Sequence, residues 1–358
     1  MSETEPATAA VTVRVPAKVN LQLAVGPARA DGYHSVVTVY HAVSLFDEVT
    51  VTPAERTSLI VRGEDAAAVP TGKTNLAWTA AAALAAAAGR RVRESALRIE
   101  IRKRIPVAAG LAGGSADAAA TLVACNELWR TGLSQRELIE IGADLGSDIP
   151  FALMGGTAVG RGRGEELTPA LATGSYHWAL AFARTGLSTA DVYATCDRIR
   201  AARRESGRRS SERSGLRTAE VAGVVGAAGG TGGAAAGSEA AEPELSRELM
   251  TALRSGSAVK VGPLLTNDLQ PAAISLLPEL RRALAAGLEY GALGAVVSGS
   301  GPTCAFLAKD AGHARDLAVA LTGAGVCRAV ARASGPAPGA ALVSPDHDDG
   351  RSRRGRLL

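Results

Sequence analysis

A glycine-rich run between residues 106 and 117 has the composition of a loop that can hold phosphate. It reads PVAAGLAGGSAD and lies between an alternating segment that ends near Arg104 and a helical pattern that begins near Ser115. Glycines let the backbone approach phosphate oxygens closely, and the first N–H groups of a helix favour a negative charge. A glycine loop by itself can equally be a tight turn, so its function depends on the residues around it.

Lys18 and Asp148 are the ionisable residues whose surroundings best fit proton transfer. An alternating run places Lys18, Asn20 and Gln22 on the polar face of a strand, although a single lysine on a strand is usually solvated. Asp148 comes directly after a helical pattern and is followed by Pro150, which rigidifies the chain. A carboxylate fixed in this way can act as a general base, but most aspartates at helix ends are turn formers.

Three other glycine-containing segments are candidates for phosphate binding. Gly299, Ser300 and Gly301 lie between two strand-like runs, so this segment is either a tight turn or a second glycine loop. Residues 72–74 resemble the end of a P-loop, but the first glycine that a P-loop needs is absent. Residues 160–164 carry their third glycine one position too early for a dinucleotide-binding fingerprint. We therefore predict neither a P-loop nor a Rossmann site.

The elements that position these residues alternate between strands and helices. Period-two alternation predicts the strands, and helical spacing with capping signals predicts the helices. One helix opens with a capping box formed by Ser134 and Glu137 and stops at Gly146. The second half alternates the two patterns, which favours a second α+β layer. The expected strands are 11–15, 19–25, 36–45, 49–51, 97–102, 178–183, 294–297, 304–308 and 326–331, and the expected helices are 75–88, 115–128, 134–145, 244–253, 278–290 and 312–321.

The composition excludes several classes of protein. The chain has 358 residues, of which 47% are hydrophobic and 21% charged, so wholesale disorder is excluded. Aromatic residues make up 3%, so the core must consist mainly of Ala, Val, Leu and Ile. Six arginines and two glutamates between residues 203 and 217 account for the formal net charge of +4. The remainder is neutral and offers no basic, aromatic face for a nucleic acid.

No membrane or export signal is found in the sequence. The most apolar window, residues 76–88, has about 13 residues, whereas about 20 are needed to span a bilayer. The N-terminal residues lack a basic region followed by an apolar core. The four cysteines match no zinc or redox spacing, so we expect buried thiols in a cytoplasmic protein.

Both ends and one internal stretch lack hydrophobic periodicity. We expect residues 1–10 and 334–358 to be disordered, and residues 203–242, first Arg/Ser-rich and then Gly/Ala-rich, to form a flexible insertion. The folded part then divides into an N-terminal domain, residues 11–172, and a C-terminal domain, residues 173–333, that carries the insertion.

Six motifs occur in the order and spacing of one enzyme superfamily, and through them the chain resembles the GHMP small-molecule kinases. The segments around Lys18, Asp31 and Ser147 are similar to the branch that phosphorylates a cytidylylated methylerythritol in the non-mevalonate isoprenoid pathway. The resemblance covers about residues 11–332 without the insertion. The motifs are Pro16–Leu21, Asp31–His34, Pro106–Asp117, Gly146–Phe151, Asn267–Pro271 and Gly299–Thr303.

The resemblance implies an α+β, GHMP-kinase-like fold of two domains. The N-terminal, ATP-binding domain is expected to be an α/β domain like that of ribosomal protein S5, the C-terminal domain α+β, and the active site the cleft between them. The implied enzyme is a phosphotransferase that uses ATP as co-substrate, with Mg²⁺, to phosphorylate the 2-hydroxyl group of the cytidylylated polyol. We expect no nucleic-acid or membrane partner, no metal held by protein side chains, and a monomer or homodimer.

The resemblance also implies catalytic and nucleotide-binding residues. Asp148 matches the catalytic base, and Lys18 is expected to lie across from it and to stabilise the developing alkoxide. Asn20 is expected beside Lys18, in contact with the substrate. The loop has alanines at three positions where glycine or serine is frequent in the family. The expected ATP-binding residues are Pro106, Val107, Ala108, Ala109, Gly110, Leu111, Ala112, Gly113, Gly114, Ser115 and Ala116.

A cytosine ring is best held by stacking and by hydrogen bonds to its edge. Tyr33 and His34 match the base-binding motif of the family, and Tyr193 is the expected opposing aromatic ring. Tyr193 can also be an ordinary core residue.

Three alternatives remain open at the level of the sequence. A homoserine or mevalonate type of kinase would share the glycine loop but has no need of Tyr33 and His34. A non-catalytic ligand sensor on the same fold would be expected to lack Lys18 and Asp148. An RNA-binding protein with a ribosomal-protein-like fold would need a basic, aromatic face outside the insertion.

Overall fold

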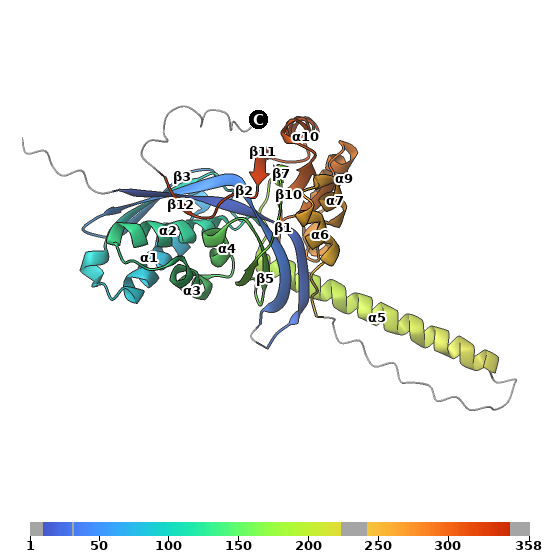
Figure 1. The fold of residues 1–358 in the computed structure, drawn as a ribbon. Coiled ribbons are helices and arrows are strands. Elements are labelled where there is room, and N and C mark those ends of the chain that lie inside the picture. The colour runs from blue at the N-terminus through green and yellow to red at the C-terminus, as the bar shows by residue number, and fades with distance from the viewer. Residues whose placement is uncertain (1–9, 31, 223–241, 344–358) are drawn as a thin grey trace, which may run out of the picture.

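Two long antiparallel strands, β1 (Val11–Ala28) and β2 (His34–Pro53), form the centre of the larger sheet (Figure 1). The computed structural model describes residues 10–30, 32–222 and 242–343. Strand order in the main path is β12-β1-β2-β4-β3, with β5 and β6 branching from β2 and with β8 parallel to β1. The other strands of this sheet are β3 (Ser58–Gly63), β4 (Leu97–Lys103), β5 (Thr157–Arg161), β6 (Glu166–Pro169), β8 (Thr266–Asn267) and β12 (Ala341–Leu342).

β1 joins two strands that the sequence predicts separately. Its pairing with β2 shifts register after Pro16 and again after Asn20, so the strand bends without ending. The polar side chains of Lys18, Asn20 and Gln22 are all buried, with exposed fractions of 6%, 2% and 5%. The expected polar face therefore exists but faces other parts of the chain instead of solvent.

Four helices, α1 (Leu76–Ala87), α2 (Gly113–Trp129), α3 (Gln135–Leu145) and α4 (Ile149–Met154), lie on one face of the larger sheet (Figure 1). Asn75 caps α1 by accepting from the backbone N–H two residues on, and the predicted capping box opens α3. α2 packs on both β1 and β2, and its face toward α1 is rich in alanine. Small side chains let the helices approach closely, which compensates for the scarcity of aromatic residues.

The second half of the chain forms a separate four-stranded antiparallel sheet in the order β11-β7-β10-β9. Helices α9 and α10 pack on its strands, and α8 packs on α5 and α9. The predicted strands and helices of this half are all present, with ends that differ by up to four residues. The strands are β7 (Tyr176–Phe182), β9 (Gly294–Val297), β10 (Cys304–Ala308) and β11 (Ala329–Gly335), and the helices are α5 (Thr189–Ala222), α6 (Arg247–Arg254), α7 (Ala258–Val261), α8 (Gln270–Leu276), α9 (Glu279–Glu289) and α10 (Ala311–Gly323).

The first part of the expected flexible insertion is helical. α5 continues through residues 203–222 and extends away from both sheets (Figure 1), so the expectation of an irregular segment is wrong there. The first turns of α5 are anchored by the buried side chains of Val192 and Cys196, and the Ala, Arg and Glu residues that follow are good helix formers. A helix that is already nucleated needs no apolar stripe to continue. Residues 223–241 lie outside the described residues.

The expected disordered C-terminal tail is also partly wrong. β11 runs to Gly335, and residues 336–343 return to the larger sheet, where the Ala337 N–H donates to the Ala42 carbonyl and β12 pairs with β1. This segment is rich in Pro and Gly and lacks periodicity because it forms backbone bonds over only a few residues. The expected disorder of residues 1–9 and 344–358 concerns residues outside the described part of the chain.

All four cysteines are unpaired and buried. Within residues 10–30, 32–222 and 242–343, no helix is both long and apolar enough to cross a membrane.

His41, on β2, is a buried histidine that the fold keeps neutral. Its Nδ1 atom forms a hydrogen bond of 2.8 Å with the Thr157 hydroxyl, and its Nε2 atom has no hydrogen-bond partner among the residues that the structure describes. Burial lowers the pKa of His41 from 6.5 to about 3. Gly335 packs so tightly against this ring that a Cβ there would lie 2.4 Å from Nε2.

The pKa of His41 predicts a loss of stability in mild acid. Below pH 6.5 the unfolded chain binds a proton at this residue while the folded chain does not, so the free energy of unfolding falls as the pH decreases toward about 3. We expect His41 to contribute a loss of about 2 kcal/mol between pH 7 and pH 5. Urea unfolding at both pH values should show this loss in the wild type and in His177→Gln, a half-buried histidine on β7, but not in His41→Gln. An unchanged pH dependence in His41→Gln would contradict the assignment.

Candidate active site

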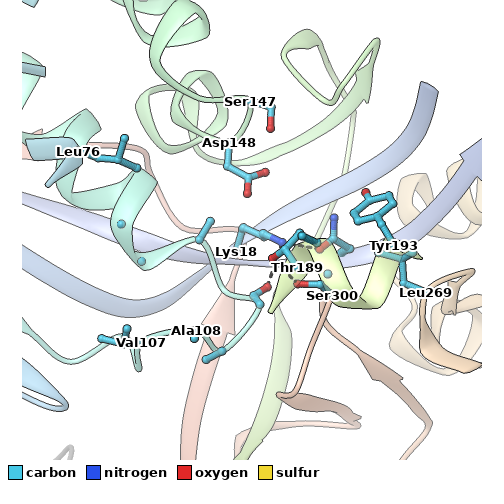
Figure 2. Close-up of a pocket in the computed structure, with 18 of the residues that line it drawn as sticks. Lys18, Leu76, Val107, Ala108, Ser147, Asp148, Thr189, Tyr193, Leu269 and Ser300 are labelled. Atoms are coloured by element: carbon cyan, nitrogen blue, oxygen red, sulfur yellow. Dashed lines mark hydrogen bonds between the residues drawn. The ribbon is translucent and has the colours of Figure 1, made fainter. Parts of the chain in front are cut away.

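A cavity of about 860 Å³ lies where the larger sheet meets elements of the second half of the chain (Figure 2). Its wall combines β1, the loop before α2 and the start of α4 with the first turns of α5 and the turn between β9 and β10. Of the residues predicted from the sequence, the cavity is lined by Lys18, Asn20, Tyr33, His34, Pro106, Val107, Ala108, Ala109, Gly110, Ala112, Gly113, Gly114, Asp148, Tyr193, Gly299 and Ser300. Leu111, Ser115, Ala116 and Gly301 lie beside the cavity without lining it.

The Lys18 ammonium group is held in place by two oxygen atoms. It donates to the Asn20 side-chain oxygen at 2.7 Å and to the Gly110 carbonyl at 3.0 Å. The Asn20 amide nitrogen in turn donates to the Thr38 hydroxyl at 2.8 Å. Asn20 therefore lines the cavity as expected, but its polar atoms are used to position Lys18.

Burial lowers the pKa of Lys18, and the negative charge of Asp148 opposes that shift. The Asp148 side chain projects from the residue that precedes α4 toward Lys18 across the cavity (Figure 2). The two side chains form no ion pair, and the two hydrogen bonds of the Lys18 ammonium group go to Asn20 and Gly110. A polar group of a bound molecule can therefore lie between the Asp148 carboxylate and the Lys18 ammonium.

Tyr40 supports both charged groups, and the sequence analysis did not single it out. Its ring lies 5.9 Å from the Lys18 Nζ atom and stacks on Phe151 with a centroid distance of 4.8 Å. Burial raises its pKa well above 10, and the charge of Asp148 and a hydrogen bond with its carboxylate act in the same direction. The rarity of tyrosine could have drawn attention to Tyr40, since the chain has five tyrosines in 358 residues. Tyr40 also lies on the strand that begins at His34, the last residue of the Asp31–His34 motif.

The predicted glycine loop is a tight turn of the backbone, and most of its residues are buried or half-buried. Ala108, Gly110 and Ala112 all adopt positive φ angles, and α2 begins at Gly113, two residues earlier than expected. No side chain caps the start of α2, so its first N–H groups remain available to an anion. Ser115 is the third residue of α2 and does not act as its cap.

The second glycine turn packs directly on this loop. A Cβ at Gly110 would lie 2.2 Å from the Ser298 carbonyl oxygen, and a Cβ at Gly299 would lie 2.9 Å from the Lys18 Nζ atom. Asn267 holds the turn from below, because its amide nitrogen donates to the Val297 and Gly299 carbonyls at 2.7 Å each. Asn267 therefore supports the second loop, and Leu269 of the same motif lines the cavity.

A buried charge cluster under the glycine loop was not predicted. The Lys103 ammonium donates to Asp47 at 2.5 Å and to Asp117 at 2.8 Å, and a Cβ at Gly113 would lie 3.0 Å from the same Nζ atom. Burial raises the pKa of Asp117 well above 3.8, while the charge of Lys103 opposes that shift. The sequence does contain a sign of this cluster, because the alternation of β4 places Lys103 on the same face as Leu97, Ile99 and Ile101, where a charged side chain needs a buried partner.

A cluster of rings lines another part of the cavity wall. His34 and Tyr193 are in contact, with centroids 4.9 Å apart and planes tilted by 35°, so they form one surface and are not opposite walls of a slot. Tyr33 is 55% exposed, and the Arg163 guanidinium lies 5.2 Å from its ring centre. His34 also pairs with Asp197 at 3.0 Å. Burial and the charge of Asp148 raise the pKa of Tyr193 to about 12.

Comparison with known proteins places these features in one family. Sequence models of the N-terminal and C-terminal domains of GHMP kinases match residues 75–156 and 249–327. The 4-diphosphocytidyl-2-C-methyl-D-erythritol kinase of Mycolicibacterium gilvum is 52% identical over 336 residues, covering 94% of each chain. The enzyme of the same name from Thermobifida fusca is 49% identical and covers 93% of this chain and 98% of its own.

Solved structures agree with this result. A crystal structure of 4-(cytidine 5′-diphospho)-2C-methyl-D-erythritol kinase is 30% identical with a TM-score of 0.65, and covers 90% of this chain and 98% of that one. A homoserine kinase from Cytophaga hutchinsonii also reaches a TM-score of 0.65, over 96% of this chain and 100% of its own, but at 16% identity it shares the fold alone. The sequence identity over nearly the full length shows that the chain belongs to the 4-diphosphocytidyl-2-C-methyl-D-erythritol kinase family of the GHMP kinases.

Proposed function

We propose that this chain transfers the γ-phosphoryl group of ATP to the 2-hydroxyl group of 4-diphosphocytidyl-2-C-methyl-D-erythritol. The observation that carries the proposal is the arrangement of Asp148 and Lys18 on opposite sides of a cavity whose adjoining wall is a glycine loop at a helix N-terminus. A proton acceptor, a fixed cation and a phosphate cradle within one cavity are the parts that phosphoryl transfer to an alcohol needs.

Asp148 accepts the proton of the substrate hydroxyl group as its oxygen attacks the γ-phosphorus atom. The new bond joins that oxygen to phosphorus, the bond between the γ-phosphorus and the bridging oxygen breaks, and ADP leaves with the electron pair. Lys18 stabilises the charge that develops on the attacking oxygen, since it is fixed before the reaction by Asn20 and Gly110.

The glycine loop and the first turn of α2 bind the phosphates of ATP through backbone N–H groups. Val69, Pro70 and Leu76 line the cavity on the same side and offer an apolar surface for the adenine ring. Within the described residues, no group of three or more His, Cys, Asp or Glu side chains can hold a metal ion. Mg²⁺ bound to the ATP phosphates would neutralise part of their charge.

The aromatic cluster distinguishes this proposal from another GHMP kinase activity. His34, Tyr193 and Tyr33 offer ring surfaces and one hydrogen-bonding edge, which suit a pyrimidine base. Homoserine and mevalonate have no ring to place there. A non-catalytic sensor would have no use for the opposed Asp148 and Lys18.

The direct test is an acceptor panel. Purified protein with Mg²⁺-ATP should release ADP with the cytidylylated methylerythritol as acceptor, and at a rate at least about 100-fold lower with homoserine or mevalonate. Equal or faster turnover of either of the latter would refute the proposed substrate.

Asp148→Asn tests the base. The amide keeps the size of the side chain but cannot accept the proton, so we expect kcat to fall by about 100-fold or more while the Kd for ATP stays within about threefold. Asp144→Asn, on the exposed face of α3, is the matched control and should behave as wild type. Near-normal turnover by Asp148→Asn would remove Asp148 from the mechanism.

A double-mutant cycle tests whether Lys18 acts on the same step. Lys18→Ala should also lower kcat, and Lys18→Ala combined with Asp148→Asn should lose far less than the product of the two single effects, because both residues act on one proton transfer. Thermal unfolding of each variant separates this effect from lost stability. Fully multiplicative losses would show that the two residues act independently.

Gly114→Val tests the phosphate cradle without disturbing the packing. A Cβ at Gly114 would find its first neighbour, the Leu76 side chain, at 3.7 Å, so the fold has room for it. The branched side chain would block the N–H groups at the start of α2, and we expect the KM for ATP to rise by about tenfold or more with little change in Tm. Gly323→Val, on α10, is the control with similar free space. A normal KM for ATP in Gly114→Val would place the phosphates elsewhere.

A further inference from the structure

Asp197 and His34 form a contact whose geometry fixes the hydrogen on the imidazole ring. The His34 Nε2 atom lies 3.0 Å from both carboxylate oxygens of Asp197. An ionised carboxylate can only accept hydrogen bonds, so Nε2 must carry the hydrogen. In the neutral ring, Nδ1 is then left as an acceptor.

The Nδ1 atom of His34 has no hydrogen-bond partner among the described residues. His34 lines the cavity, and its side chain is 8% exposed. Tyr193 and Asp197 lie one helical turn apart on α5. The same helix therefore packs the Tyr193 ring against the imidazole and places the Asp197 carboxylate where it determines which ring nitrogen carries the hydrogen. The Asp197 side chain is 44% exposed and forms no ion pair with a lysine or arginine within the described part of the chain.

A bare ring nitrogen discriminates between the two common pyrimidines. Cytosine carries an amino group at position 4, which donates hydrogen bonds, whereas the corresponding atom of uracil is a carbonyl oxygen, which only accepts them. An acceptor facing an acceptor leaves two polar groups unpaired, and sites that discriminate in this way reject the wrong partner strongly.

We propose that Asp197 is a specificity-determining positioning residue, which holds His34 in the tautomer that accepts a hydrogen bond from the amino group of cytosine and thereby excludes uridine analogues of the substrate. This inference rests on the proposed function and adds to it the residue that selects the base. Asp197 also lines the cavity, and in this proposal it acts through His34 instead of binding the base itself.

The first test compares two acceptors that differ in the base alone. With the cytidylylated and the uridylylated polyol diphosphate, wild type should prefer the cytidine compound by about 100-fold or more in kcat/KM. Asp197→Asn should lower this preference by about tenfold or more, mainly through KM, because an amide can present either a donor or an acceptor to Nε2. Asp197→Glu restores an obligate acceptor and should retain more of the preference than Asp197→Asn. Asp191→Asn removes the same charge from the exposed first turn of α5 and should leave the preference unchanged.

The outcomes separate this inference from the proposed function. If wild type does not phosphorylate the cytidine compound, the proposed function fails. If it does, and Asp197→Asn keeps the wild-type preference or loses both acceptors equally, the role of Asp197 in selecting the base is refuted while the proposed function stands.

A second test reads the tautomer directly and needs no turnover. Long-range ¹H–¹⁵N correlation spectra of the full chain, with His34 assigned through His34→Gln, should show a protonated Nε2 and a bare Nδ1 at neutral pH. The chain has five histidines, so the spectrum is simple to assign. A hydrogen on Nδ1, in either the other tautomer or the imidazolium, would overturn the inference.

Discussion

The burial of one ammonium group, that of Lys18, sets the architecture of the site. A charged group that is 6% exposed is costly unless it finds hydrogen-bond partners, and Lys18 finds them in Asn20 on its own strand and in a carbonyl 92 residues away. That carbonyl belongs to Gly110, so the glycine loop has to lie against β1. The second glycine loop packs against the Lys18 Nζ atom, so closely that a Cβ at Gly299 would lie 2.9 Å from it. One electrostatic requirement therefore ties together three segments that are far apart in the sequence.

The rest of the fold makes this close approach possible with small side chains. The backbones of the two glycine loops are in contact at Gly110. The buried side chains of α1 and α2 are mostly alanines, so α2, which follows the first loop, can pack close to its neighbours. Three of the five tyrosines line the cavity. The cavity wall therefore consists of backbone and small residues near the glycine loop and of aromatic rings around His34 and Tyr193.

The sequence predicted the parts of the structure that are local and missed those that depend on distant neighbours. The grouping of Lys18, Asp148 and the glycine loop around one cavity is nonlocal, and it was predicted only because the motifs that contain them resemble those of the GHMP kinases. The buried pair of Lys103 with Asp117 was missed, because a lysine on an apolar strand face is informative only once its partners are known. The side-chain oxygen of Asn20 accepts a hydrogen bond from Lys18 and its amide nitrogen donates to Thr38, so neither is free in the way that the expected substrate contact requires.

The errors in the chain ends and the insertion have similar causes. Composition identified residues 203–222 as polar and glycine-containing, but the packed start of α5 provides a nucleus from which good helix formers continue. Residues 334–343 read as a loop, yet their backbone groups complete the edge of a sheet formed by the first strand of the chain. In segments this short, hydrogen bonds to distant strands produce no periodic pattern of hydrophobic residues in the sequence.

In the proposed mechanism the cavity holds the acceptor so that its 2-hydroxyl group alone lies between Asp148 and Lys18. The most direct measurement is the ³¹P and ¹³C NMR spectrum of the product formed from ATP and 4-diphosphocytidyl-2-C-methyl-D-erythritol. We expect a single new phosphomonoester whose phosphorus couples to carbon 2 of the polyol. Phosphate on another hydroxyl group, a mixture of positional isomers, or ADP release without a new phosphomonoester would contradict it.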